Sequence, residues 1–172
     1  DDPHPWGSAY GGLALVRGKA AGLAVPEPAL EKLRDYLRAV LQGKATSAND
    51  EWAREMHPVE PFAAWVLALS GAPDHAYDTR LFETRATLPT FSLALLALAA
   101  KEAGDDPNML ATLRGELTAK VSLEGDRAFV RRTSDVWYYA TMDSDVRTTA
   151  LVLMALQRLA PEDPLVDKLA RG

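Results

Sequence analysis

Two carboxylates lie two residues apart at Asp143 and Asp145, directly before the most clearly apolar helical pattern of the chain. Carboxylates at this spacing can chelate a divalent cation, or one of them can act as a general acid. A helix cap explains the pair more simply. As the N-cap of the following helix, Asp145 would accept hydrogen bonds from the backbone amides of Arg147 or Thr148 at the positive helix end. We therefore expect capping rather than metal binding.

The same segment holds a cation and an aromatic run. Arg147 falls in the first helical turn, where the helix dipole disfavours a positive charge, so we expect an acidic partner, with Asp143 as the candidate. Trp137 and Tyr139 precede the helix and are candidates for a ligand-stacking platform. Amphipathic aromatic side chains at such a junction more often pack at the edge of a core with their polar atoms in water.

Other catalytic groups are sparse. The chain has three histidines and no cysteine, which excludes disulfides, thiolate metal sites and a cysteine nucleophile. His4, His57 and His75 are isolated in the sequence, without the spacing of a zinc site, and are expected to be solvated loop residues. Asp105 and Asp106 are explained by a turn before Pro107. We expect no metal, no cofactor and no enzymatic activity.

The length, composition and net charge of the chain are typical of a single globular domain. The 172 residues have a net charge of −5, which argues against a nucleic-acid surface, since such a surface needs clustered Lys and Arg. No run approaches the roughly 20 apolar residues of a membrane span. The chain does not begin with Met and has no signal peptide, so we interpret Asp1 as a processing or cutting boundary and the chain as a piece of something larger.

Hydrophobic periodicity predicts helices along most of the chain. Residues 1–7 contain two prolines and are predicted not to be helical, and residues 122–142 form a connection with room for a short hairpin. The helices are expected from Ser8 to Gly22, from the Pro26–Pro28 region to Gly43, from Phe62 to Gly71, over 75–86, over 90–103, over 107–121, after Asp145, and from Pro164.

These helices alternate in character. Weakly polar helices rich in Ala and Leu are repeatedly followed by amphipathic helices that open with proline. An apolar helix is normally buried on all sides, and an amphipathic one has a single wet face, so the pattern predicts two layers built from helical hairpins. Stacked hairpins form an open solenoid or a closed α/α toroid. The regular 34-residue spacing of tetratricopeptide repeats is missing, and we favour an all-α toroid.

Several motifs together resemble the thioester domain of bacterial alpha-2-macroglobulins, along essentially the whole chain. The most specific of them runs from Ser144 to Leu153. The others are Trp6-Gly7-Ser8-Ala9-Tyr10, Ala21-Gly22-Leu23-Ala24-Val25-Pro26, Leu88-Pro89-Thr90-Phe91 through Ala103-Gly104, and Asp163-Pro164-Leu165-Val166. The resemblance implies an α/α toroid of helical hairpins within a large exported, usually periplasmic, protein. Such proteins entrap proteases: cleavage of a bait region frees a thioester that couples to the attacker.

One departure from the family is decisive for chemistry. The family thioester joins a Cys to a Gln three residues on, and this chain has no Cys. Either the motif precedes these residues in the parent chain, or this member belongs to the subset of the family that lacks the thioester. In both cases no thioester residue can be assigned here. Family members bury the thioester among aromatic side chains, and the resemblance makes Trp6 and Tyr10 candidates for such a wall. Residues 1–172 are then a single-domain fragment of an incomplete toroid, with at most four hairpins against about six in a complete one.

This interpretation implies partners and leaves alternatives. The expected partners are other domains of the parent chain and, through the full-length protein, target proteases; an open apolar edge predicts self-association or marginal stability of the fragment. One alternative is a toroid enzyme of the terpene-cyclase or six-hairpin glycosidase type that uses Asp143 and Asp145. Such cyclases carry Asp-x-Asp-Asp, whereas Val146 occupies the fourth position here. The other is a helical-repeat scaffold that binds a peptide through Trp137 or Tyr139.

Overall fold

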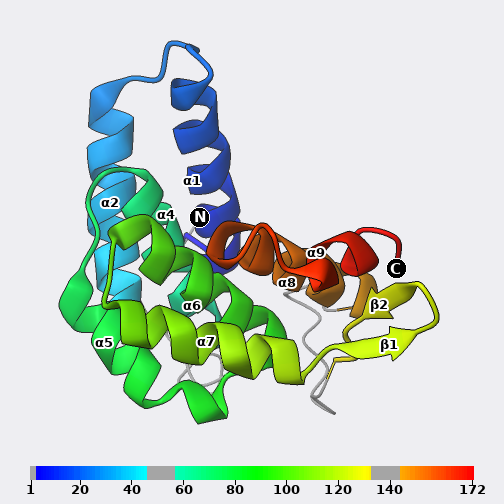
Figure 1. Cartoon of the computed structure of the whole chain (residues 1–172). Helices are drawn as coiled ribbons and strands as arrows, with labels where there is room; N and C mark the ends of the chain where they lie inside the picture. The colour runs from blue at the N-terminus through cyan, green and yellow to red at the C-terminus, as the bar shows by residue number, and fades with distance from the viewer. Residues whose placement is uncertain (1–2, 46–56, 133–143) are drawn as a thin grey trace.

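A computed structural model describes residues 3–45, 57–132 and 144–172. Within these ranges the chain forms eight α-helices and one short two-stranded sheet, which confirms the all-α class (Figure 1). The helices are α1 (Pro5–Ala20), α2 (Glu27–Leu41), α4 (Glu60–Leu69), α5 (His75–Glu83), α6 (Thr90–Ala103), α7 (Pro107–Ala119), α8 (Asp145–Leu159) and α9 (Pro164–Leu169). Short 3-10 turns, η1 (His57–Val59) and η2 (Arg85–Thr87), precede α4 and α6.

The centre of the molecule is built on α4 and α6. Leu, Ala and Phe side chains occur on every face of α6, so the helix is buried from Thr90 to Ala100 and must be covered on all sides. Gly104 ends it in the left-handed conformation with a φ of 76°, which a glycine adopts without steric cost. Helix α6 packs between α4 and α8, and α1 packs against α4. These four helices form the predicted inner layer.

The outer layer consists of α2, α5, α7 and α9, each following an inner helix as the second half of a hairpin. Proline lies in the first turn of α2, α7 and α9. Backbone N–H groups in the first turn of a helix have no intrahelical acceptor, so the N–H group that proline lacks is not needed there. These three hairpins follow the predicted pairing, whereas α5 begins after the cap residue Asp74 without proline in its first turn, and the inner helices α1 and α4 also carry a proline there. The arrangement of these hairpins into a toroid, complete or incomplete, stays a prediction. None of the described helices is both long and apolar enough to cross a membrane.

The connection after α7 contains the predicted hairpin. Strands β1 (Ser122–Glu124) and β2 (Arg127–Phe129) pair antiparallel, with Leu123 opposite Ala128. Gly125 turns the chain between them with a φ of 61°. Strand β2 lies against α8 and α9, and Ala128 is fully buried there. The hairpin thus closes one end of the last helical pair, on the right of Figure 1.

The first helix differs from the prediction, because α1 begins at Pro5 inside the segment predicted not to be helical. Proline is favoured at the first helical position, and His4 supplies the cap: its Nδ1 accepts a hydrogen bond from the amide of Gly7 at 3.4 Å. His4 is therefore exposed and outside the helix, as predicted, and in addition caps α1.

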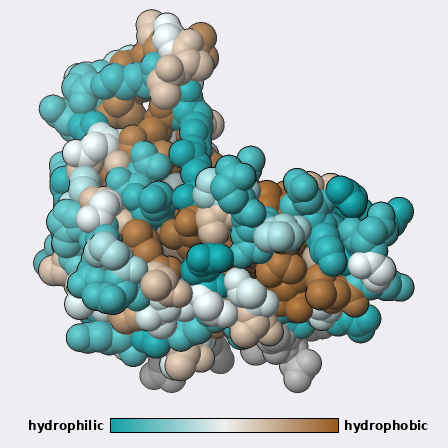
Figure 2. All heavy atoms as spheres, viewed as in Figure 1, coloured by the Kyte–Doolittle hydropathy of each residue, from teal (hydrophilic) through white to brown (hydrophobic). Residues whose placement is uncertain are grey.

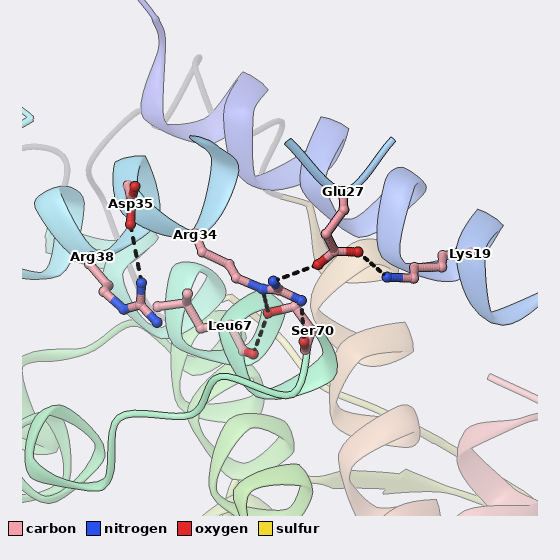
Figure 3. A network of polar contacts seen from close by, with 7 residues as sticks. All are labelled: Lys19, Glu27, Arg34, Asp35, Arg38, Leu67 and Ser70. Carbon is pink, nitrogen blue, oxygen red and sulfur yellow. Dashed lines mark hydrogen bonds and ion pairs between the residues drawn. The ribbon is translucent and has the colours of Figure 1, made fainter. Parts of the chain in front are cut away.

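The hairpin of α1 and α2 projects beyond the other helices, at the upper left of Figure 1. A polar network fixes it to the end of α4 (Figure 3). Glu27 accepts from Lys19 at 2.5 Å and from Arg34 at 3.0 Å, and the other guanidinium nitrogens of Arg34 donate to the hydroxyl and carbonyl oxygens of Ser70 at 3.2 and 2.8 Å. These two cations hold the pKa of Glu27 below its ordinary value. Figure 2 shows hydrophobic residues along the seam between the two helices and in further patches over the middle and lower right of the molecule, among a largely hydrophilic surface.

Candidate functional site

Five side chains from four inner helices meet in one cluster, called here the arginine cluster: Trp6 and Tyr10 of α1, Phe62 of α4, Phe91 of α6 and Arg147 of α8. The ring of Trp6 lies 6.0 Å from those of both Phe62 and Phe91. Tyr10 meets Phe62 edge to face at 4.8 Å. Each residue lies in the first or second turn of its helix, so the amino-terminal ends of the four inner helices converge here.

Arg147 lies at the middle of this cluster. Its guanidinium carbon is 4.8 Å from the ring centre of Phe91 and 5.7 Å from that of Trp6, and its Nη2 donates to the hydroxyl of Tyr10 at 3.0 Å. A cation over an aromatic face is worth roughly 0.5–2 kcal/mol, which offsets its unfavourable place at a helix amino terminus. Arg147 thereby bridges α8 to α1.

Two polar atoms in the cluster have no acceptor within the described part of the chain. Among the described residues, nothing accepts a hydrogen bond from the buried Nη1 of Arg147 or from the buried indole Nε1 of Trp6. Trp6 is only 1% exposed, so it is a core residue, whereas Tyr10 is 38% exposed. An arginine with an unused buried donor beside an exposed tyrosine can bind a carboxylate or carbonyl group from outside these residues.

The prediction that Asp145 caps α8 is wrong by one residue. The N-cap is Ser144, whose hydroxyl accepts from the amide of Arg147 at 3.1 Å. Asp145 is the first helical residue, exposed, and its carboxylate accepts from the backbone amide of Arg132 at 2.9 Å. It anchors the segment after β2 and stabilises the positive helix end. The predicted partner of Arg147, Asp143, lies outside the described residues, as do Trp137 and Tyr139.

A second polar contact ties α8 to the same segment. Thr149 is 8% exposed, and its hydroxyl both accepts from the amide of Val130 at 2.9 Å and donates to the carbonyl of Val130 at 3.3 Å. Val130 is fully buried, so one threonine satisfies both backbone groups of a residue that continues the line of β2. Thr149 therefore positions the chain just before residues 133–143.

The structure also assembles a group that the sequence analysis missed. His75 begins α5, Asp78 follows one turn later, and Asp105 lies in the turn between α6 and α7. The His75 Nδ1 and the Asp105 Oδ1 are 2.5 Å apart, and one ligand atom from each of the three residues lies within 4.8 Å of the others. We call these residues the acid–histidine cluster. The interpretation of His75 as an isolated loop residue is wrong.

Charge and burial shift the ionisation of this cluster. Asp78 is 1% exposed; its burial, and then the neighbouring charge of Asp105, raise the pKa of Asp78 to about 7. The hydrogen bond to Asp105 raises the pKa of His75. The three-residue spacing of His75 and Asp78 could have predicted that they share one face of a helix. No sequence pattern predicts that Asp105 lies beside them. Asp106 caps α7 through the amide of Asn108, as the turn prediction implies.

Known structures resemble the whole described arrangement. The chain superposes with a TM-score of 0.73 on native alpha-2-macroglobulin from Escherichia coli, in a crystal structure that spans domain MG7 to the C-terminus, at 25% identity over 99% of this chain. The chain shares its fold with bacterial alpha-2-macroglobulins. A trypsin-activated form of the Escherichia coli alpha-2-macroglobulin matches at 23% identity and a mutant Salmonella alpha-2-macroglobulin at 22%, over 99% and 97% of this chain and both with a TM-score of 0.73.

The match concerns one part of those proteins. This chain spans 26% of the MG7-to-C-terminus alpha-2-macroglobulin and 11% of each of the other two. No protein-family model and no curated protein sequence matches it. The resemblance to alpha-2-macroglobulin that the sequence motifs indicated is thus confirmed at the level of the fold.

Proposed function

We propose that this chain is a non-catalytic helical domain, part of the thioester region, of a bacterial alpha-2-macroglobulin-like protein that entraps proteases. The observation that supports this most strongly is the structural match, which extends over 99% of the chain at a TM-score of 0.73. One of the matching proteins is described as activated by trypsin. The chain supplies packing and interdomain surface. The 172 residues contain no cysteine, so any thioester of the proposed parent uses residues outside this chain.

The test uses the full-length parent protein and trypsin. If the parent entraps proteases, trypsin bound to it will still hydrolyse a small chromogenic peptide, because the peptide diffuses in, and will lose activity on a large protein substrate. The isolated 172-residue chain is the control and is expected to inhibit neither reaction. Equal trypsin activity on both substrates in the presence of the full-length protein would overturn the proposal.

The arginine cluster indicates which residues could shield a thioester of the parent chain. Tyr10 has its hydroxyl on Arg147 and part of its ring at the surface, so it can cover a reactive group brought by the parent chain, whereas Trp6 supports it from the core. In a parent that has the thioester, Tyr10→Ala is expected to accelerate the release of a thiol by methylamine. Thr112→Val, a substitution on the distant helix α7, serves as the control and is expected to leave that rate unchanged.

The proposed parent is exported, and we place it in the periplasm in line with the family. Its partners are then the other domains of the parent and the trapped protease. Cell fractionation of the source bacterium with an antibody against this domain tests the location. Recovery of the parent in the cytoplasmic fraction would contradict it.

A further inference from the structure

We propose that His75, Asp78 and Asp105 form a binding site for a divalent transition-metal ion, with zinc as the best-fitting ion. The site lies between the start of α5 and the turn that joins α6 to α7, away from the arginine cluster. It does not depend on the function proposed above. A buried carboxylate, the set of donor atoms and their separation support this site.

Asp78 is the observation that requires a ligand. Its side chain is almost completely buried, and neither of its oxygens has a hydrogen-bond donor among the described residues. The carboxyl group of Asp105 faces it, and the two can hydrogen-bond only when one of them is protonated. The Oδ2 of Asp105 is also buried without a donor among these residues. Burying a carboxylate without a partner costs several kcal/mol, so the group must be neutralised by a proton or by a cation.

The donors are close enough for one ion to reach all three. Their ligand atoms lie within 4.8 Å of one another. Zinc bonds of about 2.0–2.1 Å in a tetrahedron put neighbouring donors roughly 3.3 Å apart. The His75–Asp105 hydrogen bond of 2.5 Å must therefore open slightly, and the third donor must move inward. The imidazole can make this adjustment because the His75 side chain is 61% exposed, whereas Asp105 is 6% exposed and held between two helices.

The donor set selects the class of ion. One imidazole nitrogen and two carboxylate oxygens suit zinc and similar first-row ions, whereas magnesium and calcium require six or more oxygen ligands. The two carboxylates balance the charge of a divalent ion. The exposed side of His75 leaves a fourth position to water. A bound ion would fasten α5 to the turn between α6 and α7 and so stabilise two adjacent hairpins.

Zinc titration of the metal-free chain tests the proposal. After dialysis against a chelator and its removal, isothermal titration calorimetry at pH 7.5 is expected to show one zinc ion per chain. The thermal midpoint should rise with zinc and stay constant with magnesium. A chain that binds no zinc overturns the proposal.

Two variants test the assigned ligands. Asp78→Asn keeps the shape of the side chain and removes the charge, and it should weaken zinc binding by more than about 100-fold, since even outer-shell changes cost about 10–100-fold. His75→Gln, at an exposed side chain that leaves the core intact, should do the same. The matched controls are Asp167→Asn and His4→Gln, at an exposed carboxylate and an exposed imidazole elsewhere, and both should keep full zinc affinity. Zinc binding that persists in His75→Gln, or that is lost in His4→Gln, assigns the ion to other residues and refutes the site.

Discussion

Replacing Thr149 with valine removes one hydroxyl group and leaves the shape of the side chain nearly unchanged. In the native protein that hydroxyl is the partner of both backbone groups of Val130. Val130 is fully buried, and water cannot replace the lost contacts without opening the structure. The substitution therefore strands one amide and one carbonyl group in the core.

The expected loss of stability follows from these two groups. A buried backbone group that loses its partner costs about 1–3 kcal/mol, and the added methyl group of valine recovers part of this. We expect Thr149→Val to lower the free energy of unfolding by about 2–4 kcal/mol. For a domain of this size that corresponds to a fall of roughly 5–15 °C in Tm. Thr149→Ser keeps the hydroxyl and loses one methyl group, so it should cost only about 1 kcal/mol.

Urea unfolding followed by circular dichroism measures these differences. Thr112→Val is the matched control, since its hydroxyl bonds only to the carbonyl of Asn108 within the same helix, and it should change stability by less than about 0.5 kcal/mol. A Thr149→Val protein as stable as Thr112→Val would refute the reasoning. It would mean that the Val130 backbone finds other partners.

Three further predictions concern helix packing, capping and association. Gly11→Ala should raise the free energy of unfolding, measured in urea, by up to about 1 kcal/mol, because nothing lies within 4 Å of the added Cβ. At Gly12 the added Cβ would lie 2.9 Å from a side-chain atom of α2, so Gly12→Ala should be less stable than Gly11→Ala by about 1 kcal/mol or more. If Gly12→Ala stabilised the protein as much as Gly11→Ala, the close approach of α1 and α2 would be contradicted. Asp163 caps α9 and pairs with Arg114, and these contacts hold the pKa of Asp163 below its ordinary value. Asp163→Ala should therefore cost about 1 kcal/mol at pH 7, a difference that shrinks below the ordinary aspartate pKa and is lost as the pH falls through the lowered pKa of the folded state. A difference of full size in acid that protonates the native carboxylate would show that charge is not its origin. The isolated chain should self-associate, as measured by light scattering, because an open apolar edge is expected. Val146→Asp, which places a charge at a side chain that is 80% exposed, should reduce this self-association. A strictly monomeric wild-type chain would count against the open apolar edge.

Helix positions could be predicted because local rules and tertiary packing agree over most of this chain. The helix over 90–103 was predicted at both ends, since Pro89 precludes an earlier start and Gly104 permits the left-handed ending. The start of α1 was missed because proline was read only as a helix breaker. At Pro5 it occupies the first position of the helix, where it is favoured.

The site was harder to predict, for two physical reasons. Ser144 and Asp145 are both good capping residues, and residue preference cannot choose between neighbours. The choice follows from the amide of Arg132, which engages Asp145 from thirteen residues away. The acid–histidine cluster is a tertiary feature as well: Asp105 reaches His75 across 30 residues through the packing of α5 on α6.

The bridge from Arg147 to Tyr10 joins residues 137 positions apart, and this separation bears on the order of folding. In a chain that emerges amino terminus first, there is an interval in which Tyr10 is present and Arg147 is not. The hairpin of α1 and α2 involves only local contacts and can form well within that interval. One face of Trp6 therefore stays without its contact to the Arg147 guanidinium until α8 has packed against α1. The amino-terminal half of the nascent domain carries an unfinished aromatic surface during this time, and a chaperone that recognises exposed aromatic side chains would act on it then.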